Sequence, residues 1–152
     1  MSDYLKDLRE KTGHMPLVLP HSVVVVFNEQ GEILLEERSD DEYFDFPGGG
    51  IDLKESAEDA AKRELLEETG LLAQELIFFN VYSGSITHYV YFNGDEIYGV
   101  DCVYLCFKYD GELKPQEDEV NNLKFYKTNE IPDKMSIRNK QIIIDLKERK
   151  II

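Results

Sequence analysis

Three glutamates with helical spacing are the residues best placed to do chemistry in this sequence. Glu64, Glu67 and Glu68 stand at positions i, i+3 and i+4, so about 100° of rotation per residue gathers them within roughly a 100° arc of one helix face. Carboxylate oxygens clustered on a rigid element are the ligands that Mg²⁺ or Mn²⁺ prefers. A solvated acidic helix face is the alternative, because this spacing is also common on helix surfaces.

The helix that carries these glutamates is well defined by its ends. Ser56 is a typical N-cap, Gly70 is a typical stop, and Ala57, Ala61 and Leu65 form an apolar stripe between them. The glutamates occupy the last turn, where the helix dipole disfavours each anion by about 0.3–1 kcal/mol and like charges repel further. A divalent cation would remove both penalties, which favours the metal site.

Hydrophobic periodicity and turn signals predict the elements around this helix. We expect strands at Val18–Phe27, Glu32–Arg38, Leu76–Ser83, Ser85–Phe92, Ile97–Tyr109 and Leu123–Lys127, and further helices at Ser2–Lys11 and Ser136–Lys150. The first two strands are predicted to form a hairpin, and the glycine run at 48–50 to break regular structure. Because several strand runs are too apolar for a one-faced sheet, the order predicts an α/β sandwich with a mixed sheet between helices.

The glutamates also belong to a longer pattern that includes the loop before the helix. It reads Gly49-x5-Glu55-x7-Arg63-Glu64-Leu65-x-Glu67-Glu68-x-Gly70-Leu71. This stretch resembles the Nudix box at every defined position. The resemblance implies the Nudix fold, an α/β/α sandwich, and hydrolysis of a nucleoside diphosphate linked to another group, dependent on Mg²⁺ or Mn²⁺.

The resemblance also implies roles for individual residues. Metal ligands are then Glu64, Glu67 and Glu68. The general base is then either one of these glutamates, for which Glu67 is the candidate, or a carboxylate later in the chain. Arg63 becomes the residue that orients a neighbouring glutamate, although a surface ion pair would explain it as well. Gly49 matches the box glycine, which we expect to adopt a positive φ and to bring its carbonyl close to a metal or a phosphate.

An acidic loop at 116–119 follows the last long strand, about where the resemblance leads us to expect a further carboxylate. Glu117 and Glu119 are both candidates for assisting the attacking water. A solvated acidic turn explains the loop equally well, and the sequence does not choose between these interpretations.

Three residues outside the box are candidates for binding substrate. Arg38 ends a predicted strand and could reach a phosphate, while Phe46 and Phe125 could stack on a nucleobase. Core packing is the alternative for both aromatic side chains. Many relatives carry a tryptophan before the box, but this chain has none, which leaves recognition of the base open.

Charge limits the partners of the chain. The 17 Lys and Arg residues against 31 Asp and Glu give a formal net charge of −14 over 152 residues. Such a protein repels duplex nucleic acid, but it can bind a small nucleoside diphosphate derivative through metal ions. We expect one domain over 1–152, with 1–16 as an N-terminal helical extension, and leave a homodimer open.

The compartment is predicted from what the sequence lacks. No apolar run approaches the roughly 20 residues that span a bilayer, and no basic segment followed by an apolar one begins the chain. Cys102 and Cys106 fall roughly 13 Å apart on a predicted strand and could not bridge. A cytoplasmic protein without membrane contact is the prediction.

Three functions are compared. A Nudix pyrophosphohydrolase requires an intact box, which this chain has, whereas a non-catalytic Nudix-like nucleotide-binding or regulatory module usually has an eroded one. Isomerisation of an isoprenoid diphosphate would need a cysteine in a pocket loop, but both cysteines fall in an apolar strand. The sequence does not rank ADP-ribose, nucleoside triphosphates, dinucleoside polyphosphates, nucleotide sugars or capped RNA as substrates.

Overall fold

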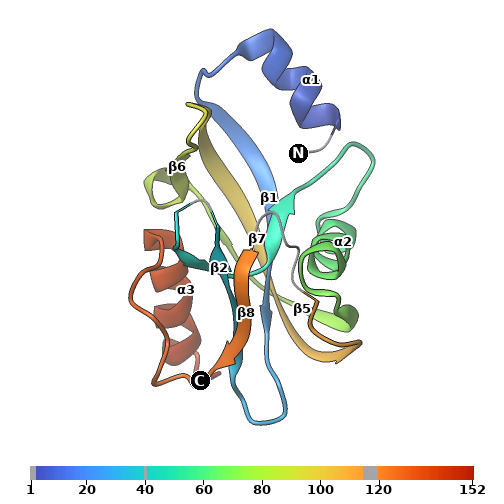
Figure 1. Ribbon diagram of the computed structural model, residues 1–152, viewed down its shortest axis with the longest axis vertical. Coiled ribbons are helices and arrows are strands. Elements are labelled where there is room, and N and C mark those ends of the chain that lie inside the picture. The colour runs from blue at the N-terminus through green and yellow to red at the C-terminus, as the bar shows by residue number, and fades with distance from the viewer. Residues whose placement is uncertain (1–2, 40, 115–119) are drawn as a thin grey trace.

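The computed structural model describes residues 3–39, 41–114 and 120–152 of the chain (Figure 1). Its elements are α1 (Asp3–Thr12), β1 (Leu17–Val26), β2 (Ile33–Arg38), β3 (Phe44–Asp45), β4 (Gly48–Gly50), α2 (Ala57–Thr69), β5 (Leu72–Tyr82), the 3₁₀ turn η1 (Gly84–Thr87), β6 (His88–Val90), β7 (Glu96–Asp110), β8 (Val120–Tyr126) and α3 (Ile137–Glu148). Most predicted elements are confirmed to within a few residues.

The strands form two sheets. The larger sheet has the order β4-β1-β7-β5, and β6 also pairs with β7. Strands β1 and β7 run parallel, and the other pairs in this sheet are antiparallel, so the predicted mixed sheet is confirmed. The smaller sheet has the antiparallel order β3-β2-β8.

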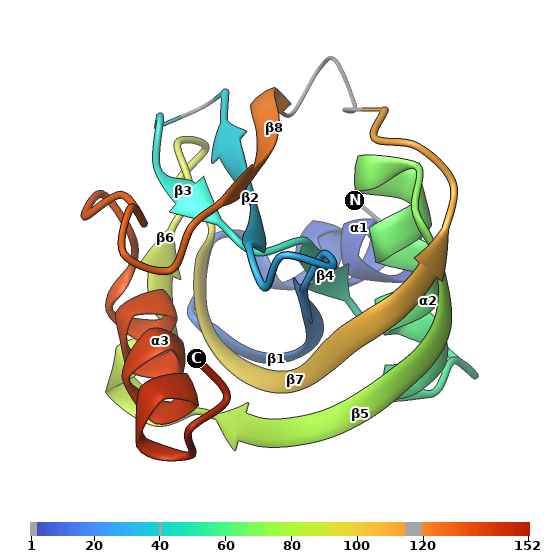
Figure 2. The ribbon, with the colours of Figure 1, turned by 90° about the horizontal axis from the view of Figure 1, so that it is seen from below.

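Strand β1 separates two apolar cores, which explains its unbroken valine run. Val23 and Val25 pack into the core that includes α3, whereas Val24 and Val26 pack into the core that includes α2. Successive side chains of a strand point to opposite faces, so a strand covered on both sides needs apolar residues throughout. Figure 2 shows α2 and α3 at opposite sides of the molecule, as the predicted sandwich requires.

The predicted hairpin of the first two strands is wrong. Strands β1 and β2 belong to different sheets, and a single bridge between Phe27 and Ile33 joins the two segments at their turn. Both edges of β1 are occupied by β4 and β7, so β2 pairs with β3 and β8 instead. The segment predicted as one strand at 85–92 also differs, because the Thr87 hydroxyl donates to the Gly84 carbonyl and closes the turn η1 before β6 begins.

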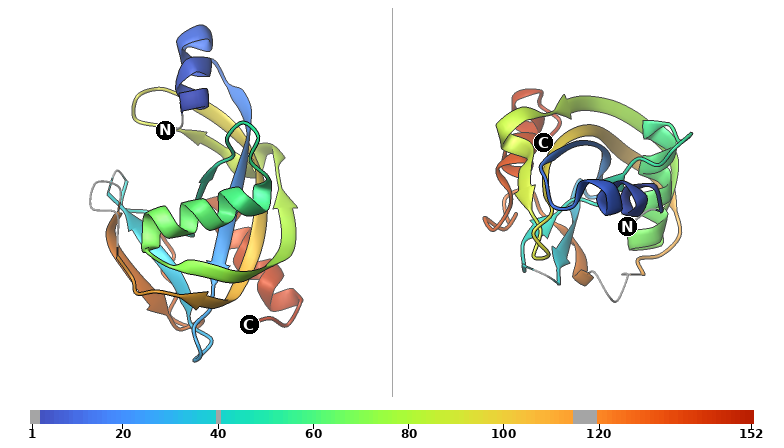
Figure 3. Two further views of the ribbon diagram at one scale, coloured as in Figure 1. Left: turned by 90° about the vertical axis from the view of Figure 1, so that its right-hand side faces the viewer. Right: turned by 90° about the horizontal axis from the view of Figure 1, so that it is seen from above.

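The caps predicted for the acidic helix are confirmed. The Ser56 hydroxyl accepts from the backbone N–H of Asp59 (3.0 Å), and Gly70 ends α2 in the left-handed conformation with φ 79°. Helix α1 lies at one end of the molecule (Figure 3) and has no buried residue. It is held by Arg9, which donates to the Glu96 carbonyl (2.9 Å).

Two findings bear on the predictions about compartment. Cys102 and Cys106 are free thiols on β7, as their spacing predicts. Within the described ranges, no helix combines the length and the apolar character needed to cross a membrane.

Candidate active site

Two of the three glutamates of α2, Glu64 and Glu68, lie against β4, and the exposure of the three differs strongly. Glu68 is buried and accepts a hydrogen bond from the backbone N–H of Gly48 (3.2 Å). The Glu64 side chain is 15% exposed and the Glu67 side chain is 55% exposed. The helix face therefore runs from a buried acid at its inner edge to one that meets solvent.

Arg63 ties this helix face to the loop before it. Its guanidinium donates to both carboxylate oxygens of Glu55 (2.7 and 2.9 Å), to Glu64 Oε1 (2.8 Å) and to the Gly50 carbonyl (2.9 Å). The hydrogen bonds from Arg63 lower the pKa of Glu55. The surface pair with Glu67 is also present, but at 3.4 Å it is the longest of these contacts. The geometry therefore favours an orienting role for Arg63 toward Glu64.

Two glycines of β4 are needed for space, Gly49 on the side of the helix and Gly48 on the side of β1. A Cβ atom on Gly49 would collide with the Glu64 carboxylate, and one on Gly48 would collide with the Ser22 carbonyl. The positive φ predicted for Gly49 is wrong, because the described glycines with positive φ do not include it. The glycine run also does not break regular structure, since it forms β4 against β1. Small residues here let a strand approach the acidic helix closely.

A second buried acid, which sequence reasoning missed, lies against Glu68. Glu36 on β2 is 4% exposed and shares a side-chain hydrogen bond with Glu68. Burial and the neighbouring Glu68 charge raise the pKa of Glu36 well above its usual range, and burial raises the pKa of Glu68 to about 8. The available signal was an acidic residue directly after the apolar run Ile33–Leu35, where a buried strand position would be apolar.

These residues fit a divalent cation. Two carboxyl groups are buried side by side, and the Glu36 Oε2 atom has no hydrogen-bond partner in the described part of the chain. A cation would neutralise acids whose burial is otherwise costly. Within the same residues no three acidic or histidine side chains are gathered into a ready set of ligands. The carboxylates are directed to other partners, since Glu64 accepts from Arg63 and Glu68 accepts from the backbone N–H of Gly48.

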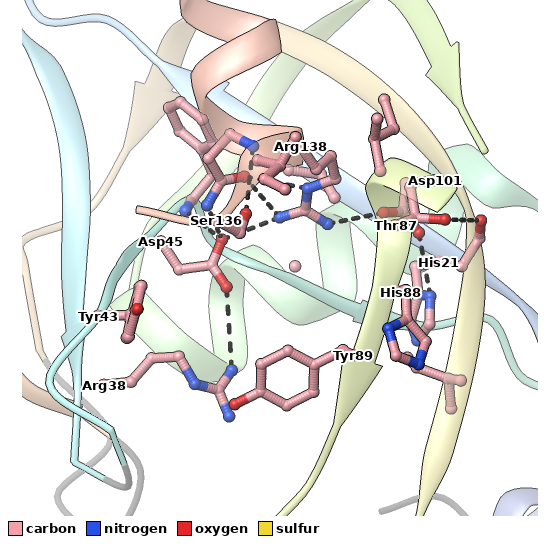
Figure 4. A pocket seen from close by; sticks show the side chains of 18 of the residues that line it. His21, Arg38, Tyr43, Asp45, Thr87, His88, Tyr89, Asp101, Ser136 and Arg138 are labelled. Atoms are coloured by element: carbon pink, nitrogen blue, oxygen red, sulfur yellow. Dashed lines mark hydrogen bonds and ion pairs between the residues drawn. The ribbon is translucent and has the colours of Figure 1, made fainter. Parts of the chain in front are cut away.

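A cavity of about 580 Å³ has the buried Glu36 in its wall. Figure 4 shows other side chains that line it. Glu36, Gly48 and Gly49 form part of its wall, and the loop before β3, the segment from η1 to β6 and the start of α3 supply the rest. Its volume lies within the roughly 300–1,000 Å³ typical of small-molecule sites. The acidic helix adjoins the cavity through Gly48 and Gly49, which lie next to Glu68 and Glu64, although none of the three glutamates is among the residues that line it.

Charged groups are paired along the wall of this cavity. Arg138 donates to Asp45 (2.9 Å) and to Asp101 (2.8 Å), and His21 Nδ1 lies 3.1 Å from Asp101 (Figure 4). Burial alone would lower the pKa of Arg138, but the two aspartates raise it. The wall thus holds paired polar groups in which acids outnumber arginines, since Glu36, Asp41, Asp45 and Asp101 line the cavity together with Arg38 and Arg138.

The structure separates the three predicted substrate-binding residues. Arg38 lines the cavity, with its guanidinium 3.9 Å from Asp45. Phe46 also lines the cavity, but it is only 2% exposed and packs in the core with α3, so its stacking on a base stays a prediction. Phe125 packs against the core of α2 and stacks on Tyr109, and it does not line the cavity. The stacking predicted for Phe125 is not supported by its position.

Tyrosines add to the aromatic surface of the cavity. Tyr43, Tyr89 and Tyr91 all line it, and the Tyr89 hydroxyl donates to Asp41, another lining residue (2.7 Å). Glu117 and Glu119, the loop acids predicted to assist the attacking water, lie outside the described residues. Their roles remain predictions.

Solved structures confirm the fold class. The chain resembles the MutT protein from Methanosarcina mazei Go1 with a TM-score of 0.74 and 18% identity, over 88% of this chain and 95% of that one. It resembles a MutT NUDIX hydrolase from Burkholderia pseudomallei with a TM-score of 0.72 and 22% identity, over 86% and 98% of the two chains. At these identities the likeness shows the fold: mixed strands flanked by helices.

The family follows from the sequence match. The model of the NUDIX domain matches residues 19–146, and the chain belongs to this family. A Bacillus subtilis (strain 168) relative named "Putative 8-oxo-dGTP diphosphatase" is 51% identical over 59 residues, 39% of this chain and 40% of that protein. An RNA pyrophosphohydrolase of Wolbachia sp. subsp. Brugia malayi (strain TRS) is 34% identical over 104 residues, 68% and 57% of the two chains. The chain thus matches about half the length of these relatives.

Proposed function

We propose that this protein is a divalent-metal-dependent Nudix pyrophosphohydrolase that cleaves the pyrophosphate bond of a nucleoside di- or triphosphate derivative. The observation that carries the proposal is the position of the acids. Glu64 and Glu68 border the same glycines, Gly48 and Gly49, that form the wall of a cavity large enough for a nucleoside. Phosphates extending from a nucleoside in the cavity would reach the acidic helix.

Each residue of the site then has a physical task. Glu64, Glu67 and Glu68 would hold Mg²⁺ or Mn²⁺, which when bound neutralises phosphate oxygens and makes its bound water more acidic. Arg63 keeps the Glu64 carboxylate oriented, and the Gly48 N–H does the same for Glu68. Glu67, the most exposed of the three, is placed to accept a proton from water.

A mononucleotide suits the cavity better than a polymer. The wall is built from side chains that enclose about 580 Å³, and a net charge of −14 opposes a long run of further phosphates. The names of the two relatives point to an oxidised guanine nucleotide and to an RNA 5′ end. We favour the nucleotide, and the RNA end is the second candidate because the matching relative bears that activity in its name.

A substrate panel tests the proposal. Purified protein with Mg²⁺ or Mn²⁺ is offered 8-oxo-dGTP, dGTP, ADP-ribose and a 5′-triphosphorylated RNA, and products are separated by chromatography. We expect one mononucleotide to be cleaved between phosphorus atoms faster than the RNA. Faster cleavage of the RNA would make the second candidate the function. Nucleotide binding without any cleavage would identify the non-catalytic module instead.

Metal should also stabilise the folded protein. Millimolar Mg²⁺ or Mn²⁺ is expected to raise the melting temperature, because the ion binds acids that are gathered only in the native state. Binding at about a hundred times the dissociation constant adds about 2.7 kcal/mol to the free energy of unfolding. Thermal denaturation in metal and in EDTA, at equal ionic strength set with NaCl, measures this. Identical melting temperatures would show that the acids bind no divalent ion.

A further inference from the structure

Glu36 occupies a position where a strand side chain would normally be apolar. It follows Leu34 on the same face of β2, and Leu34 packs in the core that contains α2. The Glu36 residue is 4% exposed, almost as well buried as Leu34. Glu37, the next residue, points to the opposite face of the strand and is partly exposed. Packing of the fold alone therefore does not explain an acidic residue at this position.

The contacts of Glu36 leave it incompletely satisfied. Its carboxyl group hydrogen-bonds to the Glu68 side chain, while Oε2 has no hydrogen-bond partner in the described part of the chain. Most buried polar atoms of native proteins have a partner, so a buried carboxylate oxygen without one points to a group that binds there. Glu36 also forms part of the cavity wall together with Gly48 and Gly49.

The charges around Glu36 indicate which kind of group binds beside it. Glu68 adjoins Glu36, Glu64 lies one helical turn before Glu68 on α2, and Asp45 on β3 is the register partner of Glu36 on β2. Glu36 and Glu68 form a buried acidic pair that calls for a cation, and only oxygen ligands are offered to it. Such a donor set suits a hard divalent ion.

We propose that Glu36 is a further ligand of the divalent-metal centre, supplied by β2 from outside residues 49–71. The inference rests on the proposed function, which places a metal at the acidic helix. It adds that the centre joins two separate parts of the fold, because Glu36 belongs to the smaller sheet and Glu64, Glu67 and Glu68 belong to α2 on the larger one. Bound metal would then tie the smaller sheet to the helix.

The experiment compares two strand variants in the full chain without nucleotide. Free Mn²⁺ is measured by electron paramagnetic resonance during titration of the wild type, Glu36→Gln and Glu37→Gln. We expect the dissociation constant for Mn²⁺ to rise at least about 10-fold in Glu36→Gln, since replacing even a residue that only supports a metal ligand costs about 10- to 100-fold in affinity. Glu37→Gln, on the opposite face of the same strand, should bind Mn²⁺ like the wild type.

Melting temperature separates a metal effect from a folding defect. The amide introduced by Glu36→Gln can donate to Glu68 and removes a buried acid, so in EDTA this variant should melt at or above the wild-type temperature. If it fails to fold, Glu36→Asp, which keeps the charge but shortens the side chain, is titrated in its place and should also bind Mn²⁺ more weakly. Wild-type affinity in the folded variant would overturn the role of Glu36. Absence of Mn²⁺ binding in the wild type would instead overturn the proposed function, and the inference with it.

Discussion

The Glu67→Gln variant should lose about two or more orders of magnitude in kcat while its KM changes little. The substitution removes the carboxylate proposed to hold the metal and to accept a proton from water, and it leaves the cavity intact. Glu67 is the most exposed of the three α2 glutamates, so the variant should fold and melt like the wild type in EDTA. Steady-state kinetics with the best substrate of the panel measures the effect.

Glu58→Gln is the matched control on the same helix. Glu58 is 53% exposed and pairs with Lys62 at 3.5 Å, while Glu67 is 55% exposed and pairs with Arg63 at 3.4 Å. The two acids thus differ mainly in position, since Glu58 lies in the first turn and Glu67 in the last. Equal kinetics in both variants would mean that α2 carries only an acidic surface.

The second large effect concerns stability. Arg138→Met should lower the free energy of unfolding by about 3–5 kcal/mol, because it leaves the buried Asp101 and the partly buried Asp45 without their shared cation. Lys134→Met, which breaks a surface pair with Glu42 at 3.7 Å, should change stability by less than about 1 kcal/mol. Urea denaturation at pH 7 measures both. Comparable losses in the two variants would contradict a structural role for the buried pair.

The effect of Arg138 should also depend on pH. Burial would raise the pKa of Asp101, but His21 and Arg138 lower it by more, so its pKa in the folded state lies below that of the unfolded chain. A group of this kind stabilises the fold above its unfolded pKa of about 3.9 and loses that contribution as pH falls through the folded pKa. The difference between wild type and Arg138→Met should therefore be largest near neutral pH and shrink in acid.

Local rules explain which features were predictable. Helix α2 was placed within a residue at each end because Ser56 and Gly70 are strong caps whose effect needs no distant partner. The acidic face followed from helical periodicity alone. Arg63 could be assigned near Glu64 because both stand on the same short segment.

Features that depend on distant pairing were not predictable. The division into two sheets depends on strands other than β1 and β2. Strands β4 and β7 pair with the two edges of β1, and β3 and β8 pair with β2, so β1 and β2 do not form a ladder with each other. The sequence left Phe46 open between stacking on a nucleobase and packing in the core, and tertiary packing buries it. Glu36 gave only a weak signal, since its partner Glu68 lies on another element far along the chain.

Hydrolysis with and without metal tests the central claim most directly. The wild-type protein is assayed with its best nucleotide substrate in Mg²⁺, after addition of excess EDTA, and again after Mg²⁺ is restored. If the acids of α2 act through a divalent ion, turnover should fall to the uncatalysed rate in EDTA and return with Mg²⁺. Undiminished turnover in EDTA would contradict the account.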